Sequence, residues 1–167
     1  MLPPAHYAIG MAAGTLAYKL TGNIPVSVGL AAATHLPLDW IWDEFWEWKS
    51  LAEYMIMGIF IFPLILLIGV TSFGYSQMLG PWPIIFGLAG VAPDVIDLVV
   101  KHITKLLGLY VNRYGNRLYG WEVFPCHYQS PLYWGQLNGM LSLEETAGME
   151  WLLGIAGIIA TYLVTRI

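Results

Sequence analysis

The chain has 167 residues, of which 57% are hydrophobic and only 11% are charged. A soluble domain carries about 25% charged residues, so this shortage indicates a protein whose solvent is lipid. The formal net charge is -4 and the few basic residues form no run, which argues against a nucleic-acid-binding protein. Since no polar half could form a separate soluble domain, we expect one integral membrane domain over residues 1–167.

Five hydrophobic stretches along the chain have the length of membrane helices. The first follows two prolines, which suit the first turn of a helix. The third and the fifth each open with a Ser-x-x-Glu capping box, a pattern typical of helix starts. The expected helices cover about 4–20, 24–42, 51–73, 81–100 and 142–167. We therefore predict an all-α, polytopic membrane helical bundle with about five transmembrane helices.

The segment 101–141, between the fourth and fifth expected helices, is rich in Tyr, Gly and Asn. It is too polar to span a bilayer, and we expect it to lie at the membrane interface. Five spans place the two termini on opposite faces, and the face with the N-terminus then carries five of the seven Lys and Arg residues. The excess of positive charge predicts that this face is cytoplasmic.

The histidines and aspartates gather on that same predicted face. Ionisable side chains within a membrane are costly and usually functional, so their gathering predicts a site. The eight residues are His6, His35, His102, His127, Asp39, Asp43, Asp94 and Asp97.

The spacing of these residues supports a metal site. His35 and Asp39 are four apart, and Asp94 and Asp97 are three apart, so each pair shares a helix face. Two neighbouring carboxylates repel unless a cation or a proton lies between them. Imidazole nitrogen with carboxylate oxygen suits zinc above all, with manganese or iron as alternatives. The predicted ligands are His6, His35, Asp39, Asp94, Asp97 and His127.

Six ligands exceed the four of a single zinc, so two metals or an acid–base role stay open, with Asp94 and Asp97 as the catalytic candidates. Pro37 and Pro93 each precede an aspartate and remove a helical hydrogen bond, which predicts kinks that turn these carboxylates inward.

Each residue also has a structural interpretation. His35 and Asp39 can be a hydrogen-bonded pair between helices, and Asp97 can pair with Lys101 one turn later. His102, beside Lys101, is typical of an interfacial residue. The third and fifth helices are expected to carry no buried acid or histidine, which favours an enzyme over a carrier open to both faces.

Three segments resemble the family of predicted membrane-bound metal-dependent hydrolases, which is distantly similar to zinc-dependent phospholipase C. They are His6-Tyr7-Ala8-Ile9-Gly10, Gly90-Val91-Ala92-Pro93-Asp94-Val95-Ile96-Asp97 and Cys126-His127-Tyr128-Gln129-Ser130. Leu36-Pro37-Leu38-Asp39 is a partial second copy of the middle segment. The chain departs from the family where a His-Arg pair is usual, at Glu122-Val123, and has Cys126 in place of a Thr.

The resemblance implies hydrolysis of an ester, above all a phosphoester of a lipid or other amphiphile, at the cytoplasmic interface. We expect the protein in the inner (plasma) membrane of a prokaryote with its N-terminus cytoplasmic, and expect membrane lipid and a lipid-like substrate as partners. The alternatives are a non-enzymatic carrier of divalent cations or protons, or a structural membrane subunit. The oligomeric state does not follow from the sequence.

Overall fold

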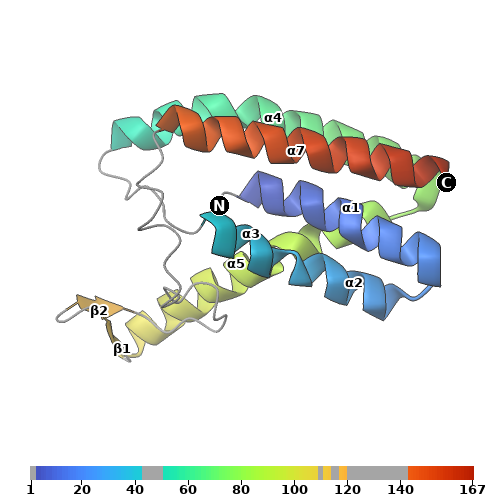
Figure 1. Cartoon of the computed structure of the whole chain (residues 1–167). Coiled ribbons are helices and arrows are strands. Elements are labelled where there is room, and N and C mark those ends of the chain that lie inside the picture. The colour runs from blue at the N-terminus through green and yellow to red at the C-terminus, as the bar shows by residue number, and fades with distance from the viewer. Residues whose placement is uncertain (1–2, 43–50, 109–110, 114–116, 120–142) are drawn as a thin grey trace.

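The computed structural model of the protein describes residues 3–42, 51–108, 111–113, 117–119 and 143–167 (Figure 1). These residues are predominantly helical, as predicted, and one short antiparallel hairpin is the exception. The elements are α1 (Pro3–Thr21), α2 (Ile24–Ala33), α3 (His35–Trp42), α4 (Leu51–Leu79), α5 (Trp82–Leu106), β1 (Val111–Arg113), β2 (Arg117–Tyr119) and α7 (Leu143–Arg166).

The helix starts agree with the predicted stretches, while two helices run further than predicted. α4 continues to Leu79, and Gly80 then adopts a φ of 72°, a left-handed conformation that favours glycine and ends helices. α5 continues through Pro93 as one helix and ends at Leu106, inside the segment predicted to be interfacial. The hairpin lies in that segment too, with Val111 opposite Tyr119.

The expected second helix, 24–42, is divided in two. α2 ends at Ala33 and α3 begins at His35, with Thr34 between them. Pro37 explains the position of the break: it has no N–H, so the carbonyl of Ala33 cannot accept the usual helical bond from four residues later. The prediction of a single helix is therefore wrong, and the proline named in the sequence lies at the discontinuity.

Three described segments are long and apolar enough to cross a membrane: Gly58–Leu79, Trp82–Thr104 and Ala147–Arg166. They support a helical membrane protein. Ile24–Leu38 is a shorter apolar stretch, and α1 does not reach the same hydropathy, so five transmembrane spans are not confirmed.

α1 lies at the centre of the bundle, between the α4–α7 pair and the layer of α2 and α5 (Figure 1). Its residues Ala5, Ala8 and Met11 are fully buried. α4, by contrast, exposes large apolar side chains such as Phe62 and Val70. A helix enclosed by protein does not need the apolar surface that a lipid-facing helix needs, which accounts for the lower hydropathy of α1.

The backbones of α1 and α5 touch at two glycines. A Cβ atom added to Gly10 would lie 2.7 Å from the Cα of Gly90, and one added to Gly90 would lie 2.5 Å from the carbonyl oxygen of His6. Small residues at helix interfaces allow this close approach in membrane proteins. The pair of glycines therefore sets the distance between the first turns of α1 and the middle of α5.

We expect Gly10→Ala to lower the stability of the protein by about 1–3 kcal/mol, because the added methyl group meets the backbone of α5. Thermal unfolding in detergent measures the effect. The matched control is Gly69→Ala in α4, where a Cβ meets nothing within 4 Å. That variant should be neutral or slightly stabilised, because alanine favours the helix; equal losses in both variants would contradict the close-contact account.

Candidate metal centre

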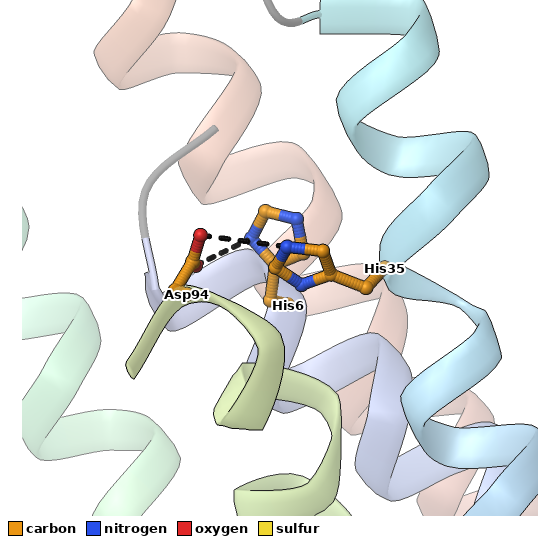
Figure 2. A group of neighbouring side chains, drawn as sticks. All are labelled: His6, His35 and Asp94. Atoms are coloured by element: carbon orange, nitrogen blue, oxygen red, sulfur yellow. Dashed lines mark ion pairs between the residues drawn. The ribbon is translucent and has the colours of Figure 1, made fainter. Parts of the chain in front are cut away.

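Three potential ligands from three different helices converge in the described structure (Figure 2). His6 comes from the first turn of α1, His35 is the first residue of α3, and Asp94 lies in the middle of α5. One ligand atom from each lies within 4.8 Å of the other two. The histidines are 0% and 1% exposed, whereas the Asp94 side chain is 27% exposed. The two imidazoles are thus closed to solvent, while the Asp94 side chain is partly exposed although its Oδ2 atom is buried.

The distances suit a single small cation. His35 Nε2 lies 3.4 Å from Asp94 Oδ1, and His6 Nδ1 lies 3.9 Å from Asp94 Oδ2. Around a tetrahedral zinc with bonds of about 2.0–2.1 Å, neighbouring ligand atoms are about 3.3 Å apart. The two imidazole rings lie with their centroids 4.2 Å apart and their planes tilted by 32°. The His35–Asp94 distance is close to this value, whereas His6 lies further from Asp94 and would have to move inward to share one zinc.

A backbone contact sets the tautomer of His35. Its Nδ1 lies 3.0 Å from the carbonyl oxygen of Gly90. Because a carbonyl oxygen only accepts hydrogen bonds, Nδ1 carries the proton and donates. In the neutral ring Nε2 then presents its lone pair toward Asp94. Metal-binding histidines are commonly oriented by such a bond from their other ring nitrogen.

Gly90 and Asp94 lie one helical turn apart on α5, so the same face of α5 orients His35 and supplies the carboxylate. The absence of a side chain at Gly90 also allows the backbone of His6 to approach α5. The site is therefore assembled against a single turn of α5.

The structure brings together three of the six predicted ligands, His6, His35 and Asp94. Asp97 is buried, 4% exposed, and follows Asp94 by three residues on α5, outside this group. Asp39 belongs to α3, but its side chain lies outside the described part of the chain. His127 lies outside the described residues altogether, as do Glu122 and Cys126.

A buried acid in the fifth expected helix contradicts the sequence-based prediction. Glu150 of α7 is 1% exposed, and its Oε2 accepts a hydrogen bond of 3.1 Å from the backbone N–H of Ala5, the residue before His6. The expectation that this helix holds no buried acid is wrong. A signal existed: Glu145 accounts for the capping box, whereas Glu150 follows it into the apolar run without such an explanation.

Comparisons with protein-family models, with curated proteins and with solved structures found no match to this chain. The interpretation of the site therefore depends on its own geometry and on the resemblance of its motifs.

We expect the purified wild-type protein to bind about one equivalent of zinc, and His35→Ala and Asp94→Asn to lose most of it, because each removes one of three ligands. Metal analysis by mass spectrometry after dialysis against zinc measures the stoichiometry. The matched control is His102→Ala, an exposed histidine on the same helix as Asp94 and outside the group. Zinc retained in all variants, or lost in the control, would contradict the assignment.

Proposed function

We propose that the protein is a membrane-embedded, metal-dependent hydrolase that acts on a phosphoester of a lipid or another amphiphile. The observation that carries the proposal is the convergence of two buried imidazoles and one partly exposed carboxylate. Catalytic zinc sites commonly have three protein ligands and a fourth position for water or substrate, whereas structural sites have four. The partly exposed side of Asp94 supports an open position of this kind.

His6, His35 and Asp94 would hold the metal, with zinc the preferred ion. When bound, such an ion lowers the pKa of a coordinated water to about 7 and polarises a phosphoryl oxygen. The two imidazoles are shielded from solvent, and the substrate would approach from the side of the partly exposed Asp94 side chain. Asp97 is the proposed general base, while Asp39 and His127 remain proposed as ligands of a second metal, so that the fourth position of the first stays open.

The position of the site along α7 is compatible with a substrate whose headgroup lies at the membrane interface. The apolar span of α7 begins at Ala147, and Glu150 near its start bonds to Ala5. Asp94 lies near the middle of the α5 span, Trp82–Thr104, whereas measured along α7 His6 is about one helical turn, about 5 Å, inside the end of the span. A phosphoester group of a lipid can reach this depth while its acyl chains remain in the bilayer.

The topology proposed with this function has α1 and the α2–α3 pair completing five passes through the bilayer. The N-terminal face is then cytoplasmic, in the inner (plasma) membrane of a prokaryote. The distribution of Lys and Arg supports this orientation.

A carrier of divalent cations is the second candidate, and Glu150 is the observation that favours it. A buried carboxylate on α7, beside the first turn of α1, gives the bundle an acidic group beyond the three-residue cluster. Ionisable residues facing the interior of a bundle also mark ion pathways. Hydrolysis and transport therefore need to be measured on the same protein.

The deciding experiment is hydrolysis of a phosphatidyl lipid in mixed micelles by the zinc-loaded protein. We expect Asp94→Asn to lose zinc and activity together. Asp97→Asn should retain zinc while its kcat falls about 100-fold or more, because removal of a general base leaves metal binding intact. His102→Ala serves as the active control.

Wild-type protein that holds zinc but hydrolyses neither this lipid nor a soluble chromogenic phosphodiester would overturn the proposal. Uptake of zinc into proteoliposomes in that case, abolished by Asp94→Asn, would establish the carrier instead.

A further inference from the structure

The carboxylate of Glu150 joins two helices at the edge of the metal centre. It belongs to α7, near the start of the apolar span, and accepts the N–H of Ala5 in the first turn of α1 at 3.1 Å. Glu150 is 1% exposed and Ala5 is fully buried, so this bond is shielded from solvent. Ala5 directly precedes His6, so this bond links α7 to the cluster of His6, His35 and Asp94, to which α7 contributes no residue.

The start of α1 explains why an acceptor is needed at this point. The first N–H groups of a helix have no partner within the helix. Pro3 and Pro4, the first two residues of α1, have no N–H, so Ala5 is the first residue of the helix that must find an acceptor. The carboxyl group also lies at the positive end of the helix dipole of α1, which favours an acceptor or an anion there.

His6 follows Ala5 directly, and this places a ligand in the part of a helix that frays most readily. A binding site needs its ligands held to about 0.5 Å by surrounding contacts. On one side α1 is held by the backbone contact of Gly90 with His6. On the other side it is held by the bond from Ala5 to Glu150. The two contacts together restrict the first turn, and with it the imidazole of His6.

We propose that Glu150 is a positioning residue of the metal centre, which holds the first turn of α1 so that His6 faces Asp94. The inference rests on the proposed metal site and adds α7 to the elements on which metal affinity depends. Glu150 acts through the backbone of Ala5 and does not itself join the three-residue group.

The test compares zinc dissociation constants of Glu150→Met and Glu150→Gln, measured by competition with a chelator. Methionine fills a similar volume without an oxygen acceptor, so we expect affinity to fall about 10- to 100-fold, the usual effect of losing an outer-shell partner. Glutamine keeps a carbonyl Oε1 that can accept a hydrogen bond from the N–H of Ala5. The zinc affinity of Glu150→Gln should therefore remain close to that of wild type.

Trp151→Phe is the matched control for general destabilisation of α7. The indole Nε1–H of Trp151 donates to the carbonyl oxygen of Phe60 at 3.0 Å, a bond between α7 and α4. The ring itself packs against a cluster that includes Ala8 of α1, and phenylalanine keeps an aromatic ring at this place. This variant should lose thermal stability with its zinc affinity unchanged. An equal loss of affinity in Trp151→Phe and Glu150→Met would overturn the positioning role, as would wild-type affinity in Glu150→Met.

Hydrogen–deuterium exchange of the metal-free protein separates this inference from the proposed function. The peptide that contains the first turn of α1 should exchange faster in Glu150→Met than in wild type or Glu150→Gln, because the N–H of Ala5 loses its acceptor. If wild type binds no zinc while this difference is present, the proposed metal site is wrong, whereas the hydrogen bond from Ala5 to Glu150 still holds the first turn of α1. Identical exchange in all three proteins would show that Glu150 does not hold the first turn of α1, whatever the zinc content.

Discussion

The contact between the backbones of α1 and α5 at Gly10 and Gly90 is the constraint on which the rest of the site depends. The two helices run in opposite directions (Figure 1). His6 therefore lies one turn beyond the contact on α1, and Asp94 lies one turn beyond it on α5, at the same end. A side chain at either glycine would separate the helices by the width of a methyl group or more. The space for a small cation is thus set by backbone packing.

The central position of α1 makes an ionisable group tolerable inside a membrane domain. α1 packs against α2, α5 and α7, so His6 is enclosed by protein. Polar groups at this depth need partners within the protein because hydrocarbon offers none. The carbonyl of Gly90 serves His35, and the carboxylate of Glu150 serves the N–H of Ala5. The site and the structural hydrogen bonds around it are parts of one polar interior.

The charge of the cluster suits a divalent ion with some affinity for nitrogen. When they bind a metal, two imidazoles and one carboxylate contribute one negative charge, so a dication held by them would be only partly neutralised. Imidazole ligands favour zinc, iron and copper over magnesium and calcium, which prefer oxygen. A remaining positive charge at the exposed side of Asp94 would attract an anionic phosphoester. Incomplete neutralisation also means that a transported cation would be held less firmly. The electrostatics alone are therefore compatible with hydrolysis and with transport.

The sequence by itself determined the predominantly helical class with apolar helices of membrane length and the approximate helix starts, because hydropathy, caps and prolines act locally. It also named the three residues of the cluster. It predicted neither the partner of His35 nor the role of Glu150. Spacing placed Asp39 beside His35 within one helix, and among the described side chains the carboxylate of Asp94, on α5, faces His35. Glu150 meets Ala5 only because α7 packs on α1. Which of six candidate ligands converge is a property of helix packing, and that packing depends on close backbone contacts between residues far apart in the chain.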